Sequence, residues 1–212
     1  MIGRSTLGLA WLVLGLTACY PDRAVDSTSE FATVTTLYDK AAPFGSVTKY
    51  ALPDTVLYVP KDSAEVPAST QNAILSAIRT QLNLLGWQEV VNPTPSNPVD
   101  VYVMTSVTKQ QNVVLGYGGW YDYWGWYPYW PPGWGGGAGW YYPGYWYAYS
   151  YETGTVLMQM ANAHAANVAE NQVPLVWVGA VNGVFENPST NVSIATAGIV
   201  QAFKQSPYLG GN

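Results

Sequence analysis

Residues 99–107 have the sequence VDVYVMTSV, in which valine recurs at almost every second position. Side chains that alternate in this way point to opposite faces of an extended chain, so the pattern predicts a half-buried β-strand. The same alternation returns in residues 154–160 and again in residues 175–185. We expect these two segments to pair as neighbouring strands, with Asn171 and Gln172 in the turn between them.

Three shorter strands are expected before residue 99. Residues 31–38 and 47–52 are rich in Thr, Val and aromatic residues, with Pro and Gly between the two segments. Such a composition favours strands separated by a turn. Residues 56–59 would add a short third strand.

Two helices are predicted from apolar residues that recur at helical spacing. Ser69 or Thr70 is expected to cap the first helix, which ends at Gly86. Ser189 or Thr190 is expected to cap the second. The apolar face of the first helix comprises Ile74, Leu75, Ile78, Leu82 and Leu85, and that of the second comprises Val192, Ala195, Ile199 and Phe203.

The order of the expected elements is strands, helix, strand, long insert, two strands and helix. This order predicts an α+β fold with a mostly antiparallel sheet and both helices packed on one face. A chain of 212 residues is long enough for one main core. We therefore expect a single α+β domain over residues 31–209, interrupted by an insert at residues 116–151.

The charge balance limits the class of partner. Charged residues make up 10% of the chain, and the formal net charge is -5. Proteins that bind nucleic acids generally need a positively charged surface for contacts with phosphates. We therefore expect no nucleic-acid partner.

The N-terminus is typical of an exported protein that is anchored by a lipid. Residues 6–16 form an uncharged, mostly apolar run, which is shorter than the roughly 20 residues of a membrane-spanning helix. The run ends in LTAC, which looks like a bacterial lipobox, and its Cys19 is the only cysteine of the chain. We expect residues 1–18 to be a lipoprotein-type signal peptide and residues 19–30 to be the lipidated cysteine and a polar tether. The alternative is an ordinary signal peptide with an incidental cysteine.

Lipoproteins of this type carry more than one acyl chain, and two or more chains hold a protein stably in a membrane. In many double-membraned bacteria an Asp after the cysteine retains the protein in the inner membrane. Tyr20 occupies that position here. We therefore expect an anchor in the outer membrane and a domain in the periplasm.

The insert at residues 116–151 has an unusual composition. It holds seven of the ten Trp and eleven of the seventeen Tyr, and its single charged residue is Asp122. So many rings exceed what a domain of this size can bury, which predicts an exposed aromatic surface on a long loop or hairpin. The proposed contact residues are Trp120, Trp124, Trp126, Trp130 and Trp134.

Several partners suit such a surface. Trp and Tyr rings favour the headgroup zone of a membrane, and they also stack on the sugars of peptidoglycan or lipopolysaccharide. Another envelope protein, or a second copy of this chain, is a third candidate. The alternative is a hairpin whose inner part extends the neighbouring strands and whose disordered tip has no specific ligand.

Catalytic and metal-binding patterns are scarce. His164 is the only histidine, and its neighbours indicate a surface loop without a nearby acid or nucleophile. No metal-ligand spacing or phosphate-binding loop is present, so neither a metal nor another cofactor is expected. Asp122, Glu152, Glu170 and Glu186 are the acids available for a glycan-cleaving enzyme, but no spacing marks a pair among them. We therefore expect a binding or structural role rather than an enzyme, with that hydrolase as the alternative.

Four segments of the sequence resemble a known family, the bacterial lipoproteins grouped as domain of unknown function 4136. The similarity is carried by YDKAAPF through to KYALP (residues 38–53), LGW followed by DVYV (85–87 and 100–103), YETGTVL (151–157) and LVWVG (175–179). The chain departs from the family pattern at Ala51 or Leu52, where an aromatic residue is common, and at Gln159 and Asn162, which replace an acidic strand end. The resemblance implies an envelope lipoprotein with an α+β domain, and it carries over no catalytic residue.

The lipid anchor can be tested by changing Cys19→Ala. Without the cysteine, the precursor should keep its signal peptide, gain mass relative to the processed form, and leave the detergent-soluble membrane fraction. Mass spectrometry and membrane fractionation measure both effects, and density fractionation distinguishes the inner from the outer membrane. Unchanged processing and partitioning would contradict lipidation of Cys19.

Overall fold

The structure, a computed structural model, describes residues 33–59, 66–108, 139–141, 154–165, 172–184 and 191–211. Its strands are β1 (Val34–Tyr38), β2 (Lys49–Ala51), β3 (Leu57–Val59), β4 (Gln88–Glu89), β5 (Val101–Thr108), β6 (Gly139–Tyr141), β7 (Thr155–Asn162) and β8 (Gln172–Val181). Its α-helices are α1 (Ala68–Leu84) and α3 (Asn191–Lys204). Short 3-10 helices are formed by η2 (Phe44–Ser46), η3 (Ala163–Ala165) and η5 (Pro207–Gly210).

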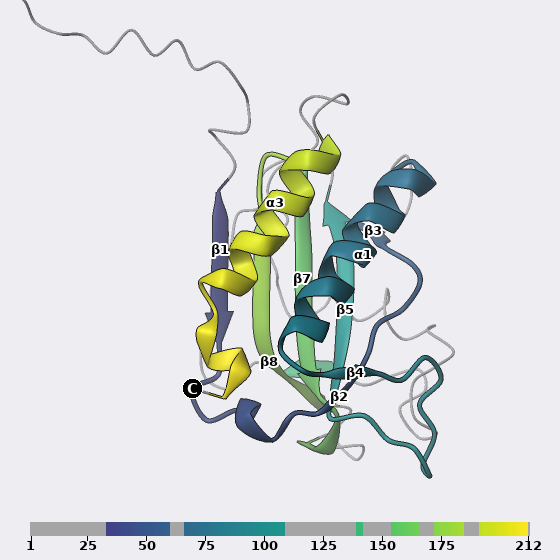
Figure 1. The fold of residues 1–212 in the computed structure, drawn as a ribbon, viewed down its shortest axis with the longest axis vertical. Helices are drawn as coiled ribbons and strands as arrows, with labels where there is room; N and C mark the ends of the chain where they lie inside the picture. Colours follow the sequence, from purple (N-terminus) through teal and green to yellow (C-terminus); the bar gives the residue numbers. More distant parts are fainter. Residues whose placement is uncertain are drawn as a thin grey trace, which may run out of the picture.

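The strands form a mixed sheet in the order β1-β8-β7-β5-β2-β4, with β3 beside β5 and β6 beside β8. Strands β1, β8, β7 and β5 pair antiparallel. The short strands β2 and β3 run parallel to β5, and β4 runs parallel to β2. Helices α1 and α3 lie side by side on one face of the sheet (Figure 1). The predicted α+β fold is therefore confirmed, including the pairing of β7 with β8.

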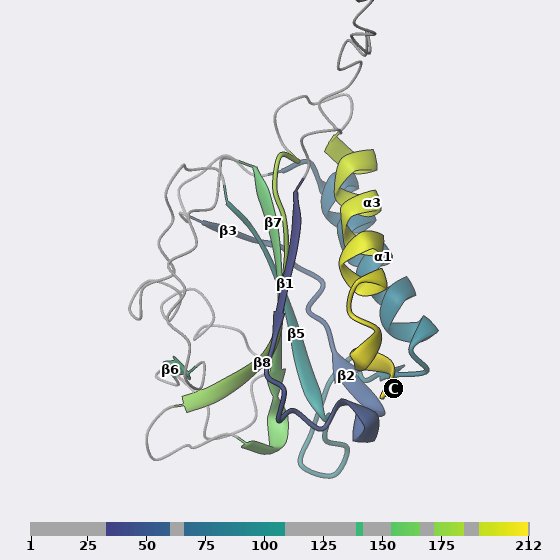
Figure 2. The same ribbon diagram turned by 90° about the vertical axis from the view of Figure 1, so that its left-hand side faces the viewer.

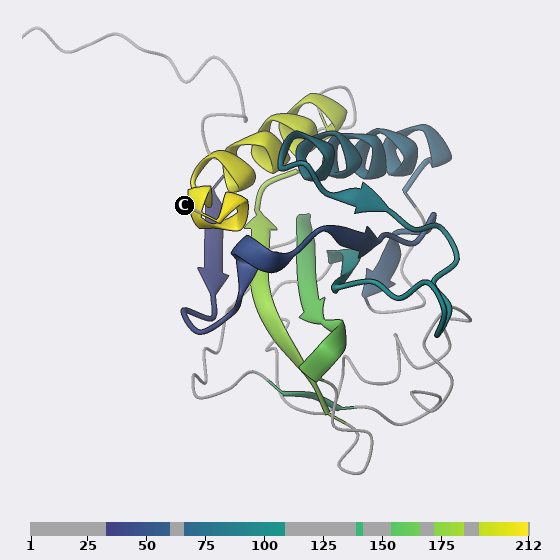
Figure 3. The ribbon, with the colours of Figure 1, turned by 60° about the horizontal axis from the view of Figure 1, so that its bottom comes forward.

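The alternating valines of β5 explain how the sheet packs against the helices. Val101, Val103 and Val107 are buried in the core between the sheet and the helices, together with Ile78 and Leu82 of α1. Burial of one such side chain stabilises a fold by about 1.5 to 3 kcal/mol relative to its exposure. Figure 3 shows the resulting layers, with the helices along one face of the sheet and β6 on the other side.

The start of α1 differs from the sequence prediction. The cap is Pro67, and it makes no hydrogen bond through its side chain. Ser69 and Thr70 lie inside the first turn, so the expected cap at either residue is wrong. The Pro67 carbonyl accepts hydrogen bonds from the N–H groups of Thr70 and Gln71, at 2.8 and 3.1 Å, and proline has no N–H of its own that would need a partner.

Two further expectations change in the second half of the chain. Gln172 is the first residue of β8 and not part of a turn. Val192 is 39% exposed, whereas Ile194 and Ala202 lie on the buried side of α3 with the three other predicted residues. Asn171, Ser189 and Thr190 lie outside the described residues.

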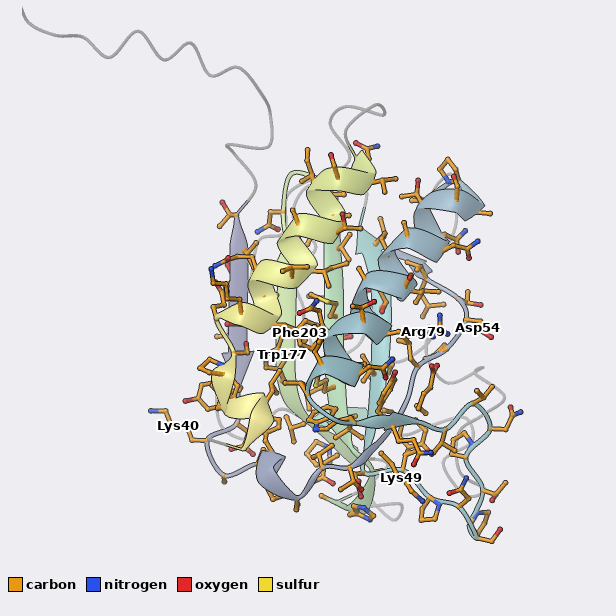
Figure 4. The ribbon with its side chains drawn as sticks, viewed as in Figure 1. Lys40, Lys49, Asp54, Arg79, Trp177 and Phe203 are labelled. Carbon is orange, nitrogen blue, oxygen red and sulfur yellow. The ribbon has the colours of Figure 1, made fainter. Side chains whose placement is uncertain are left out.

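Trp177 of β8 fixes α3 on the sheet. Its ring lies 5.3 Å from the ring of Phe203, measured between centroids (Figure 4). Its indole N–H donates a 3.0 Å hydrogen bond to the buried hydroxyl of Ser206, just beyond the helix. The indole also occupies the space beside Gly179, where a Cβ atom would meet the ring. The large ring is therefore accommodated by a glycine on the same strand.

A second glycine sets the distance between α3 and the sheet. A Cβ atom on Gly198 would collide with the side chain of Val181 in β8. We expect Gly198→Ala to lower the free energy of unfolding by about 1 to 2 kcal/mol, because overpacking outweighs the gain of about 1 kcal/mol in helix propensity. Urea unfolding measures this loss.

The control for this prediction is the compensating change Val181→Ala. The double variant should lose less stability than the sum of the two single variants, because the shortened side chain makes room for the new methyl group. Additive losses would show that the contact between Gly198 and Val181 does not set the helix position.

Candidate functional site

Most site residues predicted from the sequence lie outside the described residues. This group comprises Cys19, Trp120, Trp124, Trp126, Trp130, Trp134, Asp122, Glu152, Glu170 and Glu186. Within the aromatic insert the structure describes β6, which pairs parallel with residues 172–174 of β8. Figure 2 shows β6 on the side of the sheet opposite to α1 and α3. Residues 139–141 of the insert are therefore attached to the domain on the side away from the helices.

The sheet surface on that side is defined here as the helix-free face. Its side chains alternate along β5, β7 and residues 177–181 of β8 with the core residues that meet the helices. The register forms two cross-strand rows, with Gln159 between Val178 and Met104 and with Leu157 between Ala180 and Ser106. All six side chains are buried.

A polar cluster surrounds Asp100, directly before β5. One carboxylate oxygen, Oδ2, accepts hydrogen bonds from the backbone N–H groups of Thr48 and Lys49, at 2.8 and 2.9 Å, and from the Thr48 hydroxyl at 3.0 Å. The other oxygen, Oδ1, lies 2.9 Å from Nε2 of His164 in η3. The backbone of Asp100 also bonds to Lys49 and to Ala163. The cluster thus joins the start of β2, the start of β5 and the end of β7.

His164 therefore has an acidic partner that sequence reasoning missed. Its side chain is 61% exposed, as expected for a surface histidine. Asp100 lies 64 positions earlier in the chain. Only the pairing of β5 with β7, which sets Val101 opposite Asn162, brings the two side chains together.

The donors around Asp100 control its ionisation. Burial by itself raises the pKa of this carboxyl, but the hydrogen bonds from His164, from the backbone of Thr48 and Lys49, and from the Thr48 hydroxyl lower the pKa to about 2. The ionised carboxylate is already occupied by these donors at both oxygens. Its geometry suits a clamp between strands better than a general base.

A second polar cluster surrounds Arg79 of α1. Arg79 of α1 donates from Nε to both carboxylate oxygens of Glu89, at 3.0 and 3.1 Å, and pairs with Asp54 through a terminal nitrogen (Figure 4). Beside it, burial and the charge of Glu89 raise the pKa of Tyr50 to about 12, and the Tyr50 hydroxyl donates to Asn83. The cluster attaches α1 to β2, to β4 and to the loop before β3.

Neither cluster forms a metal centre. Among the described residues there is no group of three or more His, Cys, Asp or Glu side chains that could hold a metal ion. Nor is any helix in the described part of the chain both long and apolar enough to cross a membrane.

Comparisons with known proteins point to one family. The family model DUF4136, described as a domain of unknown function, matches residues 34–208. The crystal structure of a DUF4136 family protein from Bacteroides thetaiotaomicron is 29% identical, with a TM-score of 0.67, and the match covers 84% of this chain and 97% of that one. The PelC dodecamer from Paraburkholderia phytofirmans is 12% identical, with a TM-score of 0.40, over 81% of this chain and 94% of that one. No curated protein matches the chain.

The clamp at Asp100 predicts a specific dependence of stability on pH. Since the pKa of Asp100 in the folded protein is about 2, below its ordinary value of 3.8, its stabilisation is complete above about pH 5 and is lost as the pH falls towards 2. Asp100→Asn should lower the free energy of unfolding by about 1 to 3 kcal/mol at pH 7, because hydrogen bonds to a charged acceptor are lost. The difference in free energy of unfolding between the Asp100→Asn variant and the unmodified chain should shrink as the pH approaches 2.

The matched control is Asp54→Asn, because the Asp54 side chain is 82% exposed. Its loss should stay below about 1 kcal/mol, the range of surface ion pairs. Denaturant unfolding between pH 2 and pH 7 measures both variants. Equal losses in the two variants, or a constant difference at Asp100 across this range, would contradict the clamp.

Proposed function

This chain belongs to the DUF4136 family, whose function is unknown, and from that premise we propose a lipid-anchored protein of the cell envelope with a binding or structural role. Its lipid on Cys19 holds it in the outer membrane, with the domain in the periplasm. The aromatic insert supplies the contact surface, through Trp120, Trp124, Trp126, Trp130 and Trp134. The partner is the membrane surface, a glycan of the envelope such as peptidoglycan or lipopolysaccharide, or another envelope protein.

The observation that carries this proposal is the attachment of the insert to the domain through β6. Residues 139–141 of the insert pair with β8 on the side away from α1 and α3. In general, a segment that is bound at an internal site as well as at its two ends has fewer accessible conformations than a free loop of the same length. Ordering it on a partner therefore costs less conformational entropy.

The composition of the insert supports contact with amphipathic partners. Indole and phenol rings combine an apolar body with one polar group, which suits lipid headgroups and the faces of sugars. The insert has one charged residue, so electrostatic recognition of a polyanion gains no support from it. The hydrolase alternative depends on acids that lie outside the described residues.

The length of the tether is compatible with contact at the membrane. Fourteen residues separate Cys19 from Val34, the first residue of β1. An extended segment of this length spans roughly 45 to 50 Å. The lipid anchor therefore allows the domain to lie against the headgroups or to reach outward towards peptidoglycan.

We test the contact surface in the chain from residue 19 onwards carrying Cys19→Ser, which lacks both the lipid and the apolar run of residues 6–16. The chain is sedimented with vesicles of phosphatidylethanolamine and phosphatidylglycerol, and separately with purified peptidoglycan. Changing the five tryptophans to serine should reduce the bound fraction several-fold, because their rings supply the contact area.

The matched control replaces four apolar residues that are exposed elsewhere on the domain, Leu84, Val91, Val192 and Val200, by serine. These changes should leave binding intact. Binding that survives loss of the five tryptophans, or that falls equally in the control, would contradict the proposed contact surface. A chain that binds neither vesicles nor peptidoglycan would exclude the membrane surface and peptidoglycan as partners. The matrix that retains the chain identifies the class of partner.

A further inference from the structure

The helix-free face is buried although α1 and α3 both lie on the opposite side of the sheet. Met104, Leu157, Val178 and Ala180 are each at most 7% exposed. Among the described elements, β6 lies on this side, and it has three residues. An uncovered sheet face of this composition would form a large apolar patch, which soluble domains rarely leave exposed. Another segment of the chain must therefore shield the face.

The register of the strands shows which segments must travel the length of the sheet. Thr108, where the chain leaves β5, lies opposite Thr155, where β7 begins. Strand β6 pairs instead with residues 172–174 of β8, beyond the far end of β7, where Ala161 meets Leu175. The chain must therefore travel the length of the sheet to reach β6 and travel it again to return to β7.

The returning part is short. Residues 142–153 connect β6 to Gly154 and reach about 40 Å at full extension. The seven residues from Thr155 to Ala161 already span about 20 Å of strand. Strand β7 lies inside the sheet, between β8 and β5, so a path around either edge would add at least two strand spacings of about 5 Å each. The direct path runs along the helix-free face.

We propose that the helix-free face is the docking site of residues 142–153, named here the return segment. Its sequence, YPGYWYAYSYET, places tyrosine at positions 145, 147, 149 and 151. This alternation is typical of an extended segment with two different sides. The tyrosine side packs on the sheet, and the opposite side faces outward.

The chemistry of the face matches tyrosine. Leu157, Met104 and Val178 supply apolar contacts for the rings, and a methionine sulfur packs favourably against an aromatic ring. The hydroxyl of Ser106 is buried and has no hydrogen-bond partner among the described residues. A phenol hydroxyl is both a hydrogen-bond donor and an acceptor. A docked tyrosine can therefore form a hydrogen bond with the Ser106 hydroxyl that provides both groups with a partner.

This inference does not depend on the proposed function. The return segment covers the sheet, whereas the five tryptophans proposed to contact the envelope precede β6 in the chain. The two halves of the insert thus have separate roles, and variants in one half leave the other half intact.

The test measures the reactivity of single thiols in the full chain carrying Cys19→Ser, which has no other cysteine. Ala180→Cys places a thiol on the helix-free face. Ala195→Cys places one in the core beneath α3, and Val200→Cys places one on the exposed side of the same helix. With Ellman's reagent, the thiols at positions 180 and 195 should react at least tenfold more slowly than the thiol at position 200.

The return segment is then altered by changing Tyr145, Tyr147, Tyr149 and Tyr151 to serine. The thiol at position 180 should become at least tenfold more reactive, while the thiol at position 195 stays protected. The matched control changes Trp120, Trp124, Trp126, Trp130 and Trp134 to serine and should leave both rates unchanged. If the four tyrosine changes also expose the thiol at position 195, a milder variant with only Tyr147→Ser and Tyr149→Ser is used. In that variant the thiol at position 180 must react faster while the thiol at position 195 stays protected.

Three outcomes would overturn the docking site. A fast reaction at position 180 in the unaltered insert would show that the face is open. If the thiol at position 180 stays protected after the tyrosine changes, or loses its protection in the tryptophan variant instead, another segment covers the helix-free face. Protection that disappears on dilution of the protein would assign it to a second copy of the chain.

Discussion

The buried indole of Trp177 is the contact on which the layered structure depends. It joins β8 to Phe203 of α3, and its N–H donates to Ser206 after the helix. The Ser206 hydroxyl also accepts a hydrogen bond from Tyr208, whose ring stacks on Tyr38 of β1 at a centroid distance of 3.7 Å. One side chain thus links a central strand, the last helix and the first strand, so that the two ends of the domain stabilise each other.

With both helices on one face, the opposite face of the sheet becomes a constraint on the rest of the chain. Strands β5, β7 and β8 carry apolar residues on both sides, which is typical of strands covered by two layers. The insert leaves and returns between β5 and β7, where Thr108 and Thr155 lie opposite each other. Its two ends are therefore adjacent, and a long insertion there leaves the strand pairing intact. The position that tolerates the insert is also next to the face that needs a cover.

Much of the fold could be predicted because its determinants are local. Alternating valines and helical spacing indicated β5, β7, β8, α1 and α3, and their order indicated the α+β class. The parallel pairing of β2, β3 and β4 could not be predicted, because it depends on which distant strands become neighbours. The cap at Pro67 was missed because side-chain capping was expected of Ser69 or Thr70, whereas the first turn bonds to the backbone carbonyl of Pro67.

The polar clusters were equally invisible in the sequence, and their geometry explains why the proposed function rests on the aromatic insert. Asp100 and His164 meet only through the pairing of β5 with β7, and both carboxylate oxygens of Asp100 are occupied by donors from this chain. Arg79 is likewise engaged by Glu89 and Asp54. Charged groups that are used to join strands and helices are poorly placed to serve a ligand as well, since binding would break the contacts that hold them. Recognition by aromatic rings does not require charged contacts within the domain to be broken. The chain concentrates such rings in the insert, which is attached to the domain through β6.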